Sequence, residues 1–426
     1  MTGLDTASQP DTHSQVGELV RYVRAHSPFY RRLYAAVPDH AKLTDLPVVP
    51  HSEYWQANTV QDNALLTGAH NDGVVFKSGG TTAAPKVSFY TRDEWREMST
   101  TFATGLPAAG VVDGDRVANL FYAGELYSSF VFTLNTLQQA PVDTVQLAVG
   151  GAASADFVLS AVRDFSATVL AGLPTSLCQL AHHVRESVGS LPDVRLLLFS
   201  GEAFYGDQRR LISSAFPNAR LRSLGYASVD GGIVGSPVAD SDDTRLHRVF
   251  PGRVLEILCP ETGAPVTKPG RAGRIVLTDL RRRLQPVVRY PTGDLAEWVD
   301  SEQGAFRLLG RSDEGARVGP VTVYLDDLRG VVEQACAGRL VTGVQVVLRR
   351  HAGKDELVLR VAGELGDREV FAERVRSGVD TIRPMFAHHV QRGLVHPLRV
   401  EDVEVADLAV NARSGKLVRL VDERAD

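Results

Sequence analysis

The stretch Ala167-Thr-Val-Leu-Ala-Gly-Leu-Pro-Thr-Ser176 shows the unit from which most of this chain is built. Its first five residues form a short apolar run, which is typical of a buried strand. Gly172 follows, and Pro174 suits the first turn of a helix, because proline loses no helical hydrogen bond there. The helix then runs toward Glu186. The stretch therefore predicts a strand, a tight turn and a helix.

The same alternation extends on both sides, from Val117 to about Val234. Repeated strand and helix units of this kind pack on a mostly parallel sheet with helices on its faces. We therefore predict the α/β fold class. The other predicted elements are strands at Arg116–Phe121, Val194–Phe199 and Leu221–Leu224 and a helix that begins at an N-cap, Asp207, and ends at Ala215.

The pattern changes in the second half of the chain. Residues 249–299 are short β-prone pieces separated by Gly and Pro, as in a small barrel or an antiparallel subdomain. Gly310–Pro320 then carries three glycines and one proline, which predicts a hinge. We expect a large N-terminal domain over residues 1–312, with mostly parallel sheets and a β-rich, barrel-like subdomain at about 245–305, and a small mobile α+β domain over 313–426.

Composition narrows the classes of function. The net charge of -5 and the pI near 6.2 argue against a broad nucleic-acid-binding surface. The three cysteines, Cys178, Cys259 and Cys336, are far apart, which offers no zinc signature and predicts buried thiols in a reducing compartment. No run approaches the roughly 20 apolar residues of a membrane span. We expect a cytoplasmic protein with no nucleic-acid or membrane partner.

The segment Phe76-Lys-Ser-Gly-Gly-Thr-Thr-Ala-Ala-Pro-Lys86 has the chemistry of a phosphate-binding loop. Small residues let backbone N–H groups approach a polyanion, two adjacent hydroxyls can donate hydrogen bonds, and Lys86 supplies charge. It is not a Walker A sequence, because the Gly-Lys-Ser/Thr ending is missing. The alternative interpretation is a flexible surface turn.

This loop resembles the Ser/Thr- and Gly-rich phosphate signature of the acyl-adenylating superfamily, which includes acyl-CoA synthetases, peptide synthetase adenylation domains and firefly luciferase. The usual form is Ser-Ser-Gly-Thr-Thr-Gly-x-Pro-Lys, and here Gly79 and Ala83 replace its second Ser and last Gly, which removes one hydroxyl and some backbone freedom. The resemblance implies that ATP phosphates are bound by Ser78, Gly79, Gly80, Thr81, Thr82 and Lys86.

Four further segments resemble the same superfamily, in the same order. Ser200-Gly-Glu-Ala203 is similar to a turn whose backbone borders adenine, and Gly225-Tyr-Ala-Ser-Val-Asp230 to a segment whose aromatic ring stacks on adenine. Asp230 stands where a Glu usually helps to hold Mg²⁺. Core packing for Tyr226 and a loop cap for Asp230 remain alternatives. The adenine-binding residues so implied are Gly201, Glu202, Ala203, Tyr226, Ala227 and Ser228.

The last two of these four segments follow in the second half of the chain, and a fifth lies near the C-terminus. Tyr290-Pro-Thr-Gly-Asp294 and Gly310-Arg-Ser-Asp313 imply a ribose site at Asp294 and Arg311 and a pivot between domains at Asp313. Asn411-Ala-Arg-Ser-Gly-Lys416 implies a catalytic lysine, Lys416, which bridges the acid and the α-phosphate.

Within the superfamily the chain resembles the phenylacetate:CoA ligase group. The residues that carry this are Ser27-Pro-Phe-Tyr-Arg-Arg-Leu-Tyr34 and Asp45-Leu-Pro-Val-Val-Pro50. The resemblance implies activation of a small carboxylic acid, aryl or short-chain, by Mg²⁺ and ATP, followed by transfer to coenzyme A as the C-terminal domain rotates. It places the acid pocket at Tyr122, Gly124, Glu125, Gly172 and Gly225.

Two other functions share these motifs. The first is an adenylating enzyme that loads the phosphopantetheine of a carrier protein or another nucleophile. The second is a nucleotide-binding module without turnover, suggested by the altered Gly79, Ala83 and Asp230. The sequence leaves the oligomeric state open, and a homodimer is compatible with it.

Overall fold

The computed structural model describes residues 12–38, 41–78, 86–311, 315–319 and 321–424. Four predicted phosphate-loop residues, Gly79, Gly80, Thr81 and Thr82, lie outside the described residues, and so does the predicted pivot Asp313. Ser78 and Lys86, which flank the loop, are described.

A five-stranded parallel sheet with strand order β4-β3-β5-β6-β7 forms the predicted α/β core. Both faces of the sheet are covered, because its central strands are buried on both sides. Leu170 and Leu197 face the helices α7 to α9, whereas Val169 and Leu196 face α4 to α6. The strands are β3 (Asp115–Asn119), β4 (Thr144–Leu147), β5 (Val169–Gly172), β6 (Leu196–Phe199) and β7 (Arg220–Ser223). The helices are α4 (Arg92–Ala103), α5 (Leu106–Ala109), α6 (Ser129–Gln138), α7 (Ala155–Asp164), α8 (Pro174–Ser187) and α9 (Gly206–Ala215).

The predicted N-cap at Asp207 is wrong. Helix α9 begins at Gly206, and its N-cap is Tyr205, which has extended backbone angles and whose backbone N–H donates to the Gln208 side chain at 3.0 Å. This hydrogen bond closes the first turn of a helix whose N-cap lies two residues before Asp207.

The β-rich region is larger than predicted, and it is not a barrel. Seven strands between Tyr226 and Arg311 form one antiparallel sheet of order β11-β12-β13-β14-β10-β9-β8, and no pairing joins the end strands β11 and β8 within the described residues. The second large sheet is therefore antiparallel, and the predicted bounds of about 245–305 omit β8 and β9. The strands are β8 (Tyr226–Ser228), β9 (Gly232–Pro237), β10 (Leu246–Val249), β11 (Arg253–Leu258), β12 (Ala272–Asp279), β13 (Tyr290–Asp300) and β14 (Ala305–Arg311).

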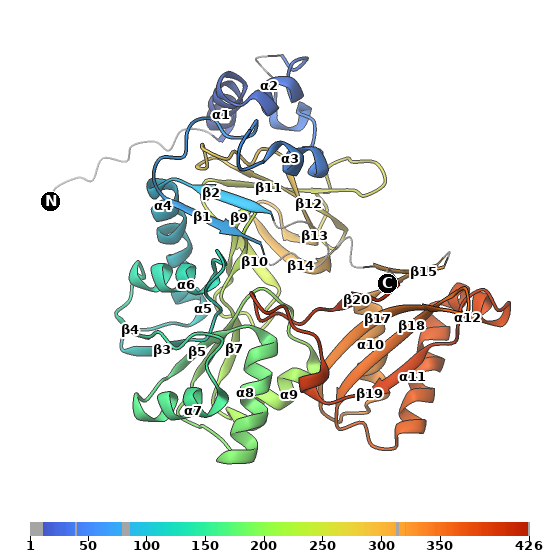
Figure 1. The fold of residues 1–426 in the computed structure, drawn as a ribbon. Coiled ribbons are helices and arrows are strands. Elements are labelled where there is room, and N and C mark those ends of the chain that lie inside the picture. The colour runs from blue at the N-terminus through green and yellow to red at the C-terminus, as the bar shows by residue number, and fades with distance from the viewer. Residues whose placement is uncertain (1–11, 39–40, 79–85, 312–314, 320, 425–426) are drawn as a thin grey trace.

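Three N-terminal helices pack on this antiparallel sheet, and they lie above it in Figure 1. The side chains of Tyr30, Tyr34 and Tyr54 are fully buried there, and the hydroxyls of Tyr30 and Tyr54 both donate to the Pro286 carbonyl. The elements are α1 (Thr12–His26), α2 (Pro28–Leu33), the 3-10 turn η1 (Leu43–Asp45) and α3 (His51–Ala57), followed by the ribbon β1 (Val74–Lys77) and β2 (Val87–Tyr90).

The C-terminal part of the chain is a separate α+β unit, which lies beside α8 and α9 in Figure 1. Its hydrophobic core takes all its members from Ala316 onward. A four-stranded sheet of order β19-β18-β17-β20 is covered by helices. The elements are β15 (Gly315–Val318), β16 (Val321–Tyr324), α10 (Leu325–Ala335), β17 (Val341–His351), β18 (Lys354–Gly363), α11 (Arg368–Ile382), α12 (Pro384–Gln391), β19 (Arg399–Asp402), η2 (Val405–Asp407) and β20 (Leu420–Asp422).

All three cysteines are buried, as predicted. Among the helices that the structure describes, none combines the length and the apolar character needed to cross a bilayer.

Candidate active site

The predicted site residues gather where the parallel strands end. Tyr122 to Glu125 come just after β3, Gly172 ends β5, the turn Ser200–Ala203 follows β6, and Gly225 follows β7. Because the carboxyl ends of parallel strands meet at one edge of the sheet, these segments lie together.

Three of the predicted adenine and ribose residues, Tyr226, Asp294 and Arg311, are linked by side-chain contacts. The Tyr226 hydroxyl donates to Asp294 Oδ2 at 2.5 Å, and Arg311 Nε lies 3.8 Å from Asp294 Oδ1. Burial raises the pKa of Tyr226 well above its ordinary value, and the Asp294 charge raises it further, so this phenol stays protonated and remains a donor. The fold thus brings residues 226, 294 and 311 to one place, although they lie on three different strands.

Lys86 and Asp230 form an ion pair, with Lys86 Nζ 2.7 Å from Asp230 Oδ2. The same oxygen accepts a hydrogen bond from the Tyr290 hydroxyl at 2.9 Å, and Trp55 Nε1 donates to that hydroxyl at 3.0 Å. Burial alone would raise the pKa of Asp230, but the Lys86 ammonium and the hydrogen bonds bring it well below its ordinary value. Asp230 is therefore ionised.

Sequence reasoning missed the parts played by Tyr290 and Trp55. Tyr290 begins the segment quoted for the ribose site, but no role follows from the motif itself. Trp55 lies on α3, within no motif, and its ring also lies 5.4 Å from the Lys86 ammonium. Only the packing of α3 on the antiparallel sheet places it there.

The donor set around Asp230 fits a magnesium ion that is carried in by a nucleotide. Within the described residues there is no cluster of three or more His, Cys, Asp or Glu side chains suited to a metal. Mg²⁺ needs no such cluster, because it usually keeps waters and takes one or two carboxylates together with substrate phosphates. One buried, ionised carboxylate is sufficient for that arrangement.

Lys416 reaches the turn that follows β6. Its Cε and Nζ atoms lie 3.0 Å from the position that a Cβ on Gly201 would occupy, so any side chain at residue 201 would displace the lysine. The next residue, Leu417, donates its backbone N–H to Glu202 Oε1 at 3.1 Å. The C-terminal domain thus brings its predicted catalytic lysine to the predicted nucleotide turn.

One loop joins this lysine to the base of the phosphate loop. Lys77, the residue before Ser78, donates its backbone N–H to the Leu126 carbonyl at 2.9 Å. Its neighbour Glu125 faces Arg413, with 3.6 Å between Oε2 and Nε. The Lys416 segment and the start of the phosphate loop therefore contact the same short loop.

The predicted acid-pocket residues take several different roles. The Tyr122 ring is held between Gly151 and Gly415, because a Cβ on either glycine would lie within 2.3 Å of that ring. Glu125 has a side chain that is 79% exposed and points toward Arg413. Gly225 packs against the Phe102 ring and Gly172 against Leu120. Tyr122 and Glu125 are thus the members that the C-terminal domain contacts, through Gly415 and Arg413.

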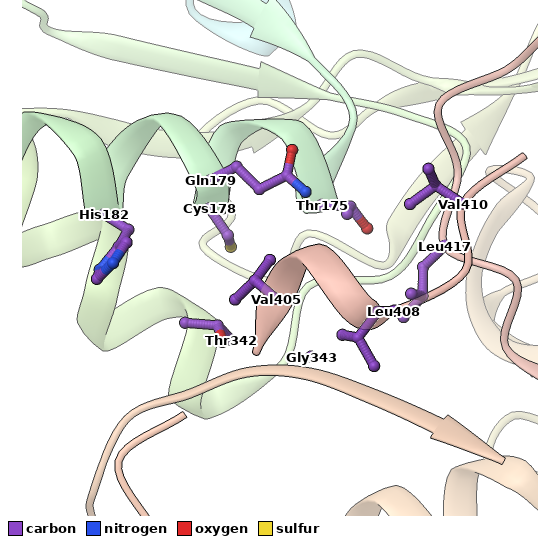
Figure 2. Close-up of a pocket in the computed structure, with 10 residues that line it drawn as sticks. All are labelled: Thr175, Cys178, Gln179, His182, Thr342, Gly343, Val405, Leu408, Val410 and Leu417. Atoms are coloured by element: carbon purple, nitrogen blue, oxygen red, sulfur yellow. The ribbon is translucent and has the colours of Figure 1, made fainter. Parts of the chain in front are cut away.

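A small cavity separates α8 from the C-terminal domain near Lys416. Its volume is about 90 Å³, and Figure 2 shows the α8 side chains facing β17 and the segment 405–417 across it. It is lined by Thr175, Cys178, Gln179, His182, Thr342, Gly343, Val405, Leu408, Val410 and Leu417.

The chain has the fold of solved acyl-CoA ligases and is similar in sequence to curated phenylacetate-coenzyme A ligases. No protein-family model matches the chain. It is similar to the phenylacetate-coenzyme A ligase of Thermus thermophilus, with 25% identity over 95% of this chain and 94% of the relative. It is also similar to the Pseudomonas putida enzyme of the same name, with 24% identity over 75% of each chain. A crystal structure of 2-hydroxyisobutyryl-CoA ligase in the postadenylation state has the same fold, with 21% identity, a TM-score of 0.70 and coverage of 96% of this chain and 88% of that one.

Proposed function

We propose that this chain activates a carboxylic acid with ATP to an acyl-adenylate and transfers the acyl group to coenzyme A. One observation carries the proposal: Lys416, from the C-terminal domain, lies against Gly201 in the turn after β6. An ammonium at the carboxyl edge of a parallel sheet suits charge that develops on a phosphate.

In the first step the acid attacks the α-phosphorus in line and pyrophosphate leaves. Asp294 and Arg311 hold the ribose, Tyr226 offers its ring to adenine, and Lys86 with the loop that begins at Ser78 binds the phosphates. Lys416 stabilises the charge that grows between carboxylate and α-phosphate. Asp230, together with triphosphate oxygens, would hold Mg²⁺, which neutralises part of the phosphate charge.

In the second step a thiol attacks the acyl-adenylate and AMP leaves. Coenzyme A as the acceptor is supported by the phenylacetate-coenzyme A ligases to which the chain is similar. The same relatives support an aryl acid, and the Tyr122 ring would supply a flat apolar wall for it. The contact of Lys416 with Gly201 supports a role for this lysine in the first step.

The test is acid-dependent exchange of labelled pyrophosphate into ATP over a panel of aryl and alkyl acids. We expect exchange with at least one aryl acid, and thioester formation when coenzyme A is added. A carrier protein and simple amines are offered in parallel as acceptors. ATP binding without exchange for any acid would instead identify a nucleotide-binding module.

A further inference from the structure

The Glu202 carboxylate joins the two domains beside Lys416. Its Oε2 accepts hydrogen bonds from the backbone N–H and the hydroxyl of Thr175, at 3.0 and 2.7 Å. Its Oε1 accepts from the Leu417 backbone N–H at 3.1 Å. The donors come from the first turn of α8 and from the residue after Lys416, so one side chain contacts both domains.

The contact made by Glu202 lies beside a cavity between the two domains. Thr175 and Leu417 both line the cavity of about 90 Å³ shown in Figure 2, so close packing does not hold the domains together at this point. Other contacts of the 405–417 segment with the N-terminal domain include Lys416 against Gly201, the Tyr122 ring against Gly415 and the Glu125 to Arg413 pair.

Fixing the Leu417 N–H also fixes the stem of Lys416, because consecutive Cα atoms are only about 3.8 Å apart. A carboxylate is needed at residue 202, since both of its oxygens accept bonds from donors. A glutamine of the same shape would turn an NH₂ group toward one of these N–H donors.

We propose that Glu202 is a positioning residue that docks the Lys416 segment for adenylate formation and must release it before acyl transfer. The inference rests on the proposed function. It gives the Glu202 side chain a task separate from the adenine contact predicted for the backbone of its turn.

The experiment compares Glu202→Gln with the wild-type full-length chain in the two half-reactions. We expect the rate of adenylate formation, measured by pyrophosphate exchange, to fall by about 10- to 100-fold. This is the scale of the effect when a catalytic group is misplaced by about 1 Å. Transfer from a presynthesised acyl-adenylate to coenzyme A should change by less than about threefold, because Lys416 acts in the first step only. Equal losses in both half-reactions, or an unchanged first one, would overturn the proposal.

Glu94→Gln is the matched control. Like Glu202, the Glu94 carboxylate accepts three hydrogen bonds, in this case from the backbone N–H groups of Thr91, Arg283 and Leu284, and all three donors belong to the N-terminal domain. It should leave both half-reactions at the wild-type rate.

Amide hydrogen exchange of residues 411–417 separates failure of this inference from failure of the proposed function. In Glu202→Gln we expect exchange at Leu417 to be about 10-fold faster than in the wild type. Faster amide exchange in a chain with no pyrophosphate exchange would uphold the docking contact and reject the enzyme. Unchanged amide exchange would reject the docking contact whatever the activity.

Discussion

Two charged residues of the candidate site, Lys86 and Glu202, are held by partners from a distant part of the chain. Lys86 and Asp230 are 144 residues apart, and Glu202 and Leu417 are 215 apart. Buried charges need such partners, because an unpaired one would lose its hydration without compensation. The site residues are therefore oriented before any ligand arrives.

Lys416→Ala should depress adenylate formation by about 10²-fold or more, the usual scale for losing one preorganised charge donor. ATP binding should remain within about threefold of wild type, because the ribose pair Asp294 and Arg311 is untouched. Pyrophosphate exchange measures adenylate formation, and equilibrium binding measures the affinity for ATP. Transfer from a presynthesised acyl-adenylate should be nearly unaffected. Lys268→Ala, which removes an exposed lysine, serves as control. A normal exchange rate in Lys416→Ala would show that Lys416 has no catalytic role.

Tyr290→Phe removes only the hydroxyl that donates to Asp230. If Asp230 helps to hold Mg²⁺, the Mg²⁺ concentration for half-maximal exchange should rise about 10-fold, as for other lost partners of metal ligands, while the rate at saturating Mg²⁺ changes little. Tyr54→Phe is the control, because its buried hydroxyl donates to the Pro286 carbonyl instead of a carboxylate. Identical Mg²⁺ dependence in both variants would show that the Tyr290 hydroxyl does not contribute to Mg²⁺ binding.

Sequence motifs predicted which residues meet at the site, but they did not predict how the side chains pair. Tyr226, Asp294 and Arg311 were expected near one nucleotide, and they lie in contact. The bond from Tyr290 to Asp230 and the one from Glu202 to Leu417 follow from no local pattern. They depend on how a sheet and two domains pack, which short-range spacing does not encode.

At the scale of elements, β7 and β10 are linked by a buried histidine. His247 Nδ1 lies 2.9 Å from the Arg245 carbonyl, which can only accept, so Nδ1 carries the proton. Nε2 lies 3.0 Å from the Ser223 hydroxyl and accepts from it. Burial lowers the pKa of His247 to about 4, although the Arg245 carbonyl and Asp243 act in the opposite direction.

This lowered pKa predicts a loss of stability in mild acid. The unfolded chain gains a proton on His247 below about pH 6.5, and the folded chain gains it only near pH 4. The free energy of unfolding should therefore fall as pH falls, by about 2 kcal/mol from this group between pH 7 and 5. Urea unfolding of wild type and His247→Gln measures it, because the variant lacks this contribution. Equal pH slopes in the two proteins would contradict the burial of a neutral ring.

Apolar runs predicted the central parallel strands, because strands that are buried on both faces are apolar throughout. The edge strand β4, which is only partly buried, was not predicted. The β-rich region was harder to delimit. Strands β8 and β9 pair with each other across a turn that contains Gly232 at φ +80°, and β9 pairs with the neighbouring β10. They join the rest of the antiparallel sheet only through the pairing of β10 with β14, which is distant in sequence, so their sequence alone did not assign them to it. The N-cap of α9 was misassigned because Asp207 is a typical capping residue, whereas Tyr205 and Gln208 close the turn instead.

At the scale of the whole molecule, the glycines of 310–320 predicted the place where one hydrophobic core gives way to another. The C-terminal core begins at Ala316, and the last strand of the large antiparallel sheet ends at Arg311. The position of the second domain was beyond the sequence. It depends on contacts between residues that are far apart in the chain, such as the hydrogen bond from the Tyr205 hydroxyl to Asp326 at 3.1 Å and the one from the Leu417 N–H to Glu202.

Because the hydrophobic cores of the two domains are separate, residues 315–426 should fold as an isolated fragment. Its 24 core residues come from this fragment alone, so excision removes none of them. We expect one cooperative urea transition and native-like circular dichroism. Leu359→Asp places a charge at a fully buried core position and should abolish that transition, which makes it the control. A fragment without cooperative unfolding would show that the C-terminal domain depends on the N-terminal one for its structure, and a domain of that kind could not rotate as a rigid body between two half-reactions.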